Sequence, residues 1–389
     1  MGKDHWQLPA TDTLVIRDTP AAGRAVFART DNLPGTHILS TSTELSPIAH
    51  VIFRPYRKEV CTQCFLYNRG REWKIRDATV GTAFCTIQCE ASWRAANDEI
   101  CLEASRAVET LIKTSHKRRS KHDVEEETTS RPLDGTSPRV DKISSEWSAA
   151  ERLGESVVRA RRTTKPTKTS RAILRSASEF MPDPDILTYA LCGVLSAYKA
   201  QELSAKMAPD AHIAPTSAAE LLPSLYQLTP DDRVFMSSPT AASPLEDYVL
   251  AYLMLLAVLP MPLLHLVSID LIVNLASRAS HNAFSIRPEG ITDGDQSGEF
   301  LGWGVWPEAS FFNHSCRPNV TKERKGRIWL FRINTTDLIA SGQQLCITYL
   351  GGDERDLDVH ERRKRLQEQW GFVCQCDRCT EESGETGLE

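Results

Sequence analysis

The sequence of 389 residues lacks three features: an apolar segment at its N-terminus, an excess of basic residues, and an uninterrupted apolar run of membrane-spanning length. Without the apolar N-terminal segment, we do not expect secretion. The formal net charge of −5 argues against a protein whose whole surface is built for nucleic acid, so any basic patch must be local. Hydrophobic residues at 41% and charged residues at 25% are typical of a soluble globular protein.

One uncharged stretch, residues 248–269, approaches the length of a membrane span. Pro260 and Pro262 interrupt it, and His265 lies near its end. A proline inside a helix removes a hydrogen bond and breaks or kinks the helix. We therefore interpret this stretch as two buried helices with a break at the prolines, and we expect no membrane partner.

Hydrophobic patterning predicts helices in the middle of the chain and strands toward both ends. Residues 186–199 place their apolar side chains on one helical face, and 172–280 as a whole reads as helical. Apolar runs near Gly and Pro predict strands. The predicted strands are at 14–16, 23–28, 327–333 and 345–349, followed by a charged helix at 353–370 and a frayed tail after Cys379.

Residues 114–170 differ in composition, because they contain few apolar side chains. Basic clusters at 117–121 and 159–162 flank three glutamates at 125–127. Such a segment is typical of a disordered or loosely helical insert. The basic clusters are interpreted either as a bipartite nuclear import signal or as a contact to nucleic acid. A solvated, mixed-charge linker explains them equally well.

The eleven cysteines include one group with the spacing of a zinc site. Cys61 and Cys64 form a short knuckle, and Cys85 and Cys89 follow about twenty residues later at the predicted start of a helix. Two such pairs can close a tetrahedral site of four thiolates. Four buried free thiols are the alternative.

A second group, Cys374, Cys376 and Cys379, falls within six residues near the C-terminus. A structural zinc takes four ligands, so a fourth must come from elsewhere in the chain. The other lone cysteines, among them Cys101, Cys192 and Cys346, are interpreted as small core side chains rather than as nucleophiles.

The most informative segment is 313–319, which reads Asn-His-Ser-Cys-Arg-Pro-Asn. Taken alone, the segment could simply form a turn stabilised by its Asn and Pro residues, or Cys316 could be a nucleophile. However, Gly342 to Tyr349 and then the C-terminal cysteine group follow it in order. With Gly23 to Ala28 and the cysteine module before them, these motifs resemble the SET domain of protein lysine methyltransferases. The resemblance is closest to the SMYD branch, in which a MYND zinc finger is inserted into the SET domain.

The resemblance implies an α+β fold: a SET β-fold with a knot-like C-terminal segment, an inserted MYND-like finger, a helical SET insert and a post-SET zinc loop. It also implies that the helical repeat domain found after this point in many SMYD proteins is missing. The implied division is an N-terminal part of the SET domain at 10–58, the finger at 59–102, a disordered or charged insert at 114–170, the helical SET insert at 172–280, the catalytic core at 281–352, the post-SET helix and zinc loop at 353–380, and a tail at 381–389.

The resemblance also implies the cofactors and the site. The methyl donor is S-adenosylmethionine, and two zinc sites are expected. Cys316 joins the C-terminal cysteine group as its fourth zinc ligand, and Tyr349 is the catalytic residue. The donor-binding positions carried over from the family are Arg24, Asn282, Ser310, Asn313, His314, Tyr349 and Phe372.

Some positions depart from the family pattern. A full MYND finger holds two zincs, but here the expected histidine is Asn97 and only Cys101 remains of the second site. We therefore predict one zinc in the finger. Ala22 and Ala25 replace residues that relatives use near the donor, which puts donor affinity in question.

The sequence therefore predicts S-adenosylmethionine-dependent methyl transfer to lysine side chains of proteins, histone or non-histone. The alternative is a non-catalytic zinc adaptor that uses the SET and MYND scaffold to recruit partners. A DNA-binding zinc protein is a third and weaker hypothesis. Whether the protein has a nucleic-acid partner is left open. We expect a monomer, located in the nucleus or the cytoplasm, that acts on a protein with an exposed lysine.

Overall fold

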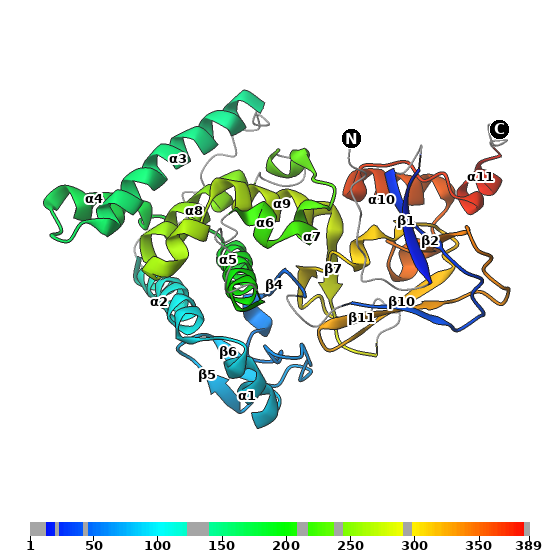
Figure 1. Ribbon diagram of the computed structural model, residues 1–389, viewed down its shortest axis with the longest axis horizontal. Coiled ribbons are helices and arrows are strands. Elements are labelled where there is room, and N and C mark those ends of the chain that lie inside the picture. Colours follow the sequence, from blue (N-terminus) through cyan, green and yellow to red (C-terminus); the bar gives the residue numbers. More distant parts are fainter. Residues whose placement is uncertain are drawn as a thin grey trace.

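A computed structural model describes residues 13–19, 23–41, 46–122, 140–207, 217–236, 244–290 and 298–384. Most helices gather at one end of the molecule and most strands at the other, where the two C-terminal helices also lie, while the cysteine module of residues 59–102 projects from the helical side (Figure 1). The mixed helix and sheet content agrees with the predicted α+β class.

One sheet joins strands from opposite ends of the chain. Its order is β1 (Leu14–Thr19), β2 (Gly23–Ala28), β12 (Gln344–Ile347) and β9 (Asn313–His314). Strands β1, β2 and β12 are antiparallel, whereas β12 and β9 are parallel, with Cys346 opposite Asn313. The strands predicted at 14–16, 23–28 and 345–349 are confirmed, although β12 ends at Ile347.

Two further sheets complete the β end. One has the order β10 (Val320–Lys325), β11 (Ile328–Ile333) and β3 (His37–Ser40), and the other β4 (Ala49–Ile52), β8 (Gly302–Val305) and β7 (Ala283–Ile286). In the second, β8 lies very close to β4. A Cβ atom built on Gly302 would lie 2.0 Å from the carbonyl oxygen of Val51, so only glycine fits there.

Helix α5 (Pro184–Met207) is the centre of the helical end, with ten of its residues buried. It packs on β4, α8 and α9. Gly193 allows α9 to approach closely, because a Cβ atom there would lie 2.2 Å from the Leu275 Cδ1 atom. The other helices of this layer are α2 (Glu99–His122), α3 (Val140–Arg162), α4 (Lys168–Ala177), α6 (Ala218–Leu221), α7 (Pro223–Tyr226), α8 (Leu245–Val258) and α9 (Ile269–Asn282).

The break predicted within 248–269 is confirmed. Helix α8 ends at Val258, a 3₁₀ segment follows at Met261–Leu266, and α9 begins at Ile269. Pro260 precedes the 3₁₀ segment as its N-cap residue. Among the described residues, no helix combines the length and apolar character needed to span a bilayer.

The described parts of 114–170, which was expected to be a disordered or loosely helical insert, are mostly regular helix. Residues Val140–Arg162 form the regular helix α3, which packs against α8, and Lys168–Ala177 form α4. Trp147, Ala150 and Val157 of α3 are buried. Apolar positions are few in this segment, but enough of them share one face to attach the helix to the core. Residues 123–139 lie outside the described part.

In the cysteine module, β5 (Ile75–Asp77) and β6 (Thr82–Phe84) form a hairpin before α1 (Ile87–Ala95). The helix was expected to open at Cys85, but it begins two residues later. Thr86 is the N-cap, and its side chain accepts a hydrogen bond from the Cys89 amide. Cys85 therefore lies just before the helix and Cys89 in its first turn.

At the C-terminal end, the charged helix predicted at 353–370 is confirmed as α10 (Val359–Trp370), although it begins six residues later, and α11 (Asp377–Ser383) replaces the frayed tail predicted after Cys379. Gly371 ends α10 in the left-handed conformation. The tail predicted at 381–389 is wrong at its start, because Glu381 pairs with Arg317 and Glu382 with Arg362. Residues 385–389 lie outside the described part.

The buried carboxylate of Glu109 on α2 ties the segment that leads into the cysteine module to the helical layer. It pairs with Arg54 and Arg57, each at 3.3 Å, and with Lys113 at 3.4 Å. Glu109→Gln leaves these cations without a counter-charge, so we expect a loss of about 2–3 kcal/mol in the free energy of unfolding, measured by urea denaturation.

Glu103→Gln is the matched control, since Glu103 is exposed on the same helix. It should change stability by less than about 0.5 kcal/mol. Equal losses in the two variants would show that Glu109 has no special role.

Candidate functional site

Four cysteine sulfurs from distant parts of the chain meet beside α10. Cys316 follows β9, Cys374 and Cys376 lie in the loop after α10, and Cys379 lies in α11. Their Sγ atoms all lie within 4.8 Å of one another. Cys316 Sγ is 3.9 Å from Cys374 Sγ and 3.5 Å from Cys379 Sγ. Four thiolates at such spacing fit a tetrahedral zinc ion, and the structure brings Cys316 to this group as the sequence predicted.

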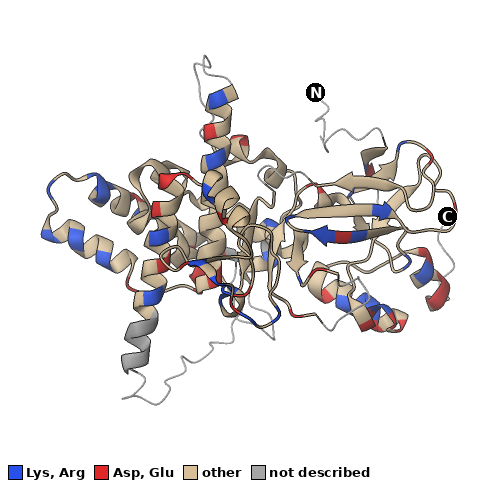
Figure 2. Ribbon diagram, turned by 90° about the horizontal axis from the view of Figure 1, so that it is seen from below, with Lys and Arg blue, Asp and Glu red and all other residues tan. Residues whose placement is uncertain are grey.

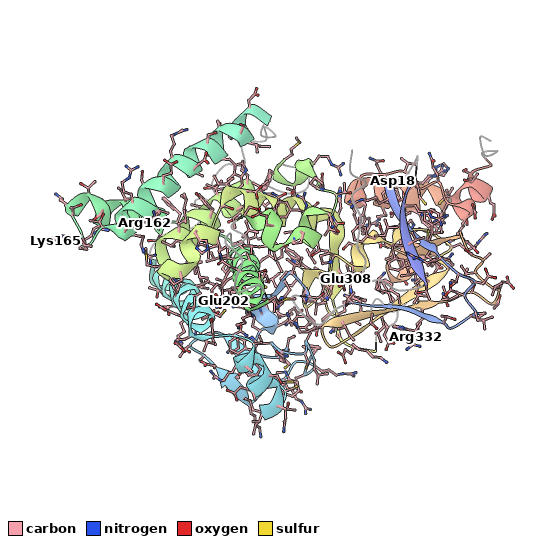
Figure 3. All side chains as sticks on the ribbon, viewed as in Figure 1. Asp18, Arg162, Lys165, Glu202, Glu308 and Arg332 are labelled. Atoms are coloured by element: carbon pink, nitrogen blue, oxygen red, sulfur yellow. The ribbon has the colours of Figure 1, made fainter. Side chains whose placement is uncertain are left out.

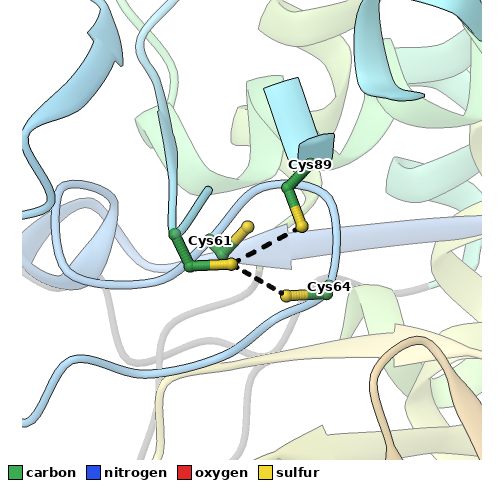
Figure 4. A group of neighbouring side chains, drawn as sticks. Cys61, Cys64 and Cys89 are labelled. Carbon is green, nitrogen blue, oxygen red and sulfur yellow. Dashed lines mark hydrogen bonds between the residues drawn. The ribbon is translucent and has the colours of Figure 1, made fainter. Parts of the chain in front are cut away.

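The second four-cysteine group lies in the finger. The sulfurs of Cys61, Cys64, Cys85 and Cys89 also lie within 4.8 Å of one another, with 3.6 Å between Cys64 and Cys85 and 3.5 Å between Cys85 and Cys89. Figure 4 shows Cys61, Cys64 and Cys89 pointing toward a common centre. This donor set also fits zinc. Within the described residues, only these two groups bring three or more ligand side chains of this kind together.

The position expected for a second zinc in the finger has different chemistry. The Asn97 side-chain oxygen accepts a hydrogen bond of 2.8 Å from Lys199 Nζ, so an ammonium group from α5 lies against it. Burial raises the pKa of the Cys101 thiol to about 12, which keeps it protonated. These residues supply no ready set of metal ligands.

Arg362 of α10 contacts the C-terminal cysteine group through a hydrogen bond to one of the sulfurs. Its side chain is fully buried, and its guanidinium donates to Cys379 Sγ at 3.5 Å and to Glu382 at 2.7 Å. Four thiolates around one Zn²⁺ carry a net negative charge, which a neighbouring guanidinium offsets.

We expect Arg362→Met to weaken zinc binding at this group about tenfold or more. Competition with a chelating dye would measure the affinity. Arg365→Met on the exposed side of α10 is the control, because its side chain is 46% exposed and far less constrained. If both variants retained zinc equally well, the buried guanidinium would not support the metal site.

A cavity of about 580 Å³ opens next to these elements. Its apolar wall is largely aromatic, and the Phe284 and Trp329 rings lie 5.1 Å apart within it. Tyr349 and Trp370 form another part of the wall, with ring centroids 5.5 Å apart. The lining also includes charged side chains, among them Glu289, Lys322 and Glu354. The aromatic part of the wall can hold the apolar stem of a side chain, while the polar part remains open to charged groups.

Tyr349 lies just after β12, where its ring faces this cavity. Its hydroxyl donates a hydrogen bond of 2.8 Å to the Phe312 carbonyl oxygen. Burial raises the pKa of the Tyr349 phenol, so the hydroxyl stays protonated at neutral pH and remains a donor.

The parallel pairing of β9 with β12 fixes Asn313 and His314 behind Tyr349. His314 Nδ1 accepts a hydrogen bond of 3.0 Å from the Tyr349 amide. Burial lowers the pKa of His314 to about 4, so the ring is neutral at neutral pH. A neutral ring that accepts at Nδ1 carries its proton on Nε2, which lies 3.2 Å from Cys316 Sγ. His314 therefore links the cavity to the cysteine group.

Hydrogen bonds connect the remaining predicted donor-binding residues. Asn313 Nδ2 donates to the Arg24 carbonyl at 3.1 Å, and the Ser310 hydroxyl donates to the Asn282 carbonyl at 3.0 Å. Thr229 joins the two pairs, because it accepts from Arg24 at its hydroxyl and from Asn282 at its carbonyl. The structure thus brings these four residues together from β2, α9, the 3₁₀ turn at Ala309–Phe311 and β9.

Not every predicted residue lines the cavity. Asn282, Ser310 and Tyr349 do, whereas Arg24, Asn313, His314 and Phe372 are not among its lining residues. Phe372 lies on the side of His314 and Tyr349, with ring centroids 6.1 Å and 6.3 Å away.

Sequence reasoning missed Thr229, the Phe312 carbonyl and Trp370. Trp370 had a local signal, since it is the last residue of a charged helix and directly precedes the Gly371-Phe372 turn. No local sequence signal pointed to Thr229, because its contact with Arg24 spans 205 residues of sequence.

Comparisons with known proteins agree on one family. A model of the SET domain matches residues 23–350. "Potential protein lysine methyltransferase SET6" of Saccharomyces cerevisiae is 27% identical over 94% of this chain and 95% of its own length. Human "Protein-lysine N-trimethyltransferase SMYD5" is 36% identical over 24% of this chain and 23% of its own length. "Histone-lysine N-methyltransferase ASHR2" of Arabidopsis thaliana is 32% identical over 29% of each.

Proposed function

Because the chain belongs to the SET domain family, we propose that its aromatic cavity is the site of methyl transfer from S-adenosylmethionine to lysine side chains of proteins. The protein is a protein-lysine N-methyltransferase, as its relatives are named. The observation that carries the assignment is the joining of Tyr349, His314 and Cys316 into one connected unit beside the cavity.

The predicted donor-binding residues offer groups that fit S-adenosylmethionine. Arg24 brings a guanidinium for a carboxylate, Asn282 and Asn313 bring amides and carbonyls for an amino group, and Phe372 brings a flat ring for adenine. Asn282 lines the same cavity as Tyr349, whereas Arg24, Asn313 and Phe372 lie outside its lining. When bound, the donor supplies an electrophilic methyl group on a sulfonium.

The cavity residues prepare the acceptor. A lysine ammonium must lose its proton before its nitrogen can attack, and a free lysine has a pKa of about 10.4. The aromatic walls made by Phe284, Trp329 and Trp370 disfavour the charged form by desolvation. The Tyr349 hydroxyl and the Phe312 carbonyl mark the polar end of this channel and align the amine.

Two structural details are also part of this proposal. We propose that residues 344–380 thread past β9 in a knot-like arrangement, supported by the pairing of β12 with β9 and the convergence of Cys316 with the C-terminal cysteines. We also propose that zinc occupies both four-cysteine groups. Histones are proposed as one class of substrate, because ASHR2 is named a histone-lysine methyltransferase.

The alternative of a non-catalytic zinc adaptor is not favoured. Methyltransferases are named among the relatives, one of which is similar over nearly the whole chain. Ala22 lies outside the described residues, whereas Ala25 is fully buried in β2 and packs as a core residue.

Isothermal titration with S-adenosylmethionine, followed by incubation with labelled donor and a cell extract, tests the assignment. We expect saturable donor binding and labelled protein bands. An Asn313→Ala/His314→Ala variant should lose both. A folded wild-type chain that showed no donor binding would refute the assignment and leave the adaptor.

A further inference from the structure

The hairpin formed by α3 and α4 carries a concentrated basic surface. Residues 156–178 contain seven Lys and Arg and no Asp or Glu, while the whole chain has a net charge of −5. Six of the seven side chains are exposed: Arg159, Arg162, Lys165, Lys168, Arg171 and Arg175. We call these six the basic hairpin. Figure 2 shows blue segments repeated along it at the left edge of the molecule.

The basic hairpin is held rigidly by the remaining residues of the segment. Arg161 turns inward, and its guanidinium donates to the carbonyls of Ala257 and Leu259 at the end of α8. Thr167 and Ser170 form a capping box at the start of α4. Ile173 and Leu174 pack against the core. The exposed cations therefore stand on a fixed surface rather than on a loose linker.

The six cations outnumber the carboxylates near them, of which Glu155 and Glu179 lie four residues from Arg159 and Arg175. Within the described residues, no salt bridge joins any of them to a carboxylate. Lys168, Arg171 and Arg175 follow one another at spacings of three and four, so they form a stripe along one face of α4. At about 1.5 Å per residue, the stripe from Lys168 to Arg175 is about 10 Å long.

From these observations we propose that the basic hairpin binds the phosphate backbone of double-stranded nucleic acid. Duplex DNA presents a negative charge about every 1.7 Å along its axis, so a rigid stripe of cations can meet several phosphates together. Arginine, which supplies four of the six cations, matches phosphate oxygens with two parallel hydrogen bonds. Residues 156–178 contain no aromatic residue on which an unpaired base could stack, and the exposed Phe180 lies three residues beyond the end of α4. The cations rather than stacking rings therefore dominate this surface, which favours a duplex over a single strand.

A membrane surface is the less favoured partner. A helix that lies in a bilayer interface needs an exposed apolar face. The apolar face of α4 is already used, since Ile173 and Leu174 pack on the core and Ala177 is buried. Near the basic hairpin the exposed Phe180 is a single ring beyond the end of α4, not an apolar helix face to insert.

The basic hairpin lies far from the catalytic cavity. Figure 3 places Arg162 and Lys165 at the helical end of the molecule, opposite the strands that carry the cavity. Binding there therefore adds an anchoring function to the enzyme without using any residue of the proposed active site.

Fluorescence anisotropy with a short fluorescein-labelled DNA duplex tests the proposal on the full chain. The variant Arg162→Gln/Lys165→Gln/Lys168→Gln/Arg171→Gln removes four charges and keeps good helix formers in α4. We expect it to bind at least about tenfold more weakly at low salt. The slope of log K against log salt concentration should become less negative by about three to four.

The matched control is Arg71→Gln/Lys74→Gln/Lys206→Gln/Arg332→Gln, which removes four exposed cations elsewhere (Arg332 is labelled in Figure 3). It should bind the duplex within about twofold of wild type. Both variants should keep the wild-type unfolding temperature and the same rate of methylation of a free peptide.

Two results would overturn the proposal. One is a hairpin variant that binds the duplex as tightly as the control does. The other is a wild-type protein that binds phosphatidylserine-containing vesicles but not the duplex, which would assign the surface to membranes instead.

Discussion

Replacing Tyr349 with phenylalanine is expected to lower the kcat for lysine methylation about 100-fold without unfolding the protein. The substitution keeps the ring, and with it the contacts to His314, Trp370 and Phe372. It removes the hydroxyl that donates to the Phe312 carbonyl. The amine then loses the hydroxyl oxygen that accepts a hydrogen bond from one of its N–H groups, so it is no longer held in line.

Steady-state kinetics with labelled donor would measure this effect, and titration with S-adenosylmethionine would check that donor binding survives. Tyr198→Phe is a suitable control, because the Tyr198 hydroxyl bonds Asp98 on the finger side of α5. We expect the control to keep activity within about twofold. A Tyr349→Phe enzyme with unchanged kcat would remove Tyr349 from the mechanism.

Loss of the C-terminal zinc is the second large effect that we expect. Cys379→Ser removes one thiolate from the buried group that ties Cys316 to α11. The zinc content should fall by one ion per chain, and methylation should become undetectable. The physical reason is that Cys316 follows His314 by two residues, so the metal holds β9, Phe372 and the end of α10 in one arrangement.

Cys89→Ser provides the comparison, since it removes a ligand from the finger group instead. It should also lose one zinc, but it should keep methylation within about fivefold, because the cavity residues come from other elements. Cys346→Ser should lose no zinc at all. Metal content by mass spectrometry and activity on the same samples would check all three variants. Equal activity of Cys379→Ser and Cys89→Ser would contradict the linkage between the C-terminal metal and the cavity.

The cysteine groups were predictable because metal ligation depends on a few side chains with short, specific spacings. Cys61 and Cys64 identify a zinc knuckle from four residues of sequence. Cys316 as the fourth member of the other group came from resemblance alone, since no local rule links positions 58 residues apart.

For helix α3, the amino-acid composition led us to expect a disordered or loosely helical segment rather than a regular helix. Charged and polar residues fill most of its 23 positions, which favours disorder on average. Trp147, Ala150 and Val157 nevertheless share a face and bury it on α8. A helix needs only one apolar stripe to be held by a neighbour, and composition does not reveal where such a stripe will dock.

The connections of the site could not be predicted for a related reason. Thr229 holds Arg24 and Asn282 through hydrogen bonds to a hydroxyl and a carbonyl. Neither contact leaves a pattern in the sequence, because each depends on how two distant segments pack. The residue types of the site could be predicted from the resemblance to the family, whereas the hydrogen bonds between them became visible only in the structure.

The sheet that joins β1 and β2 to β12 and β9 has a consequence for how the protein is made on the ribosome. The emerging chain can build the finger and the helical layer early, but β2 must wait for more than 300 residues before β12 is available to pair with it. Until then, one edge of the β1–β2 ribbon stays open to unwanted partners. A prematurely terminated product should therefore aggregate or be degraded rather than persist as a partly active enzyme.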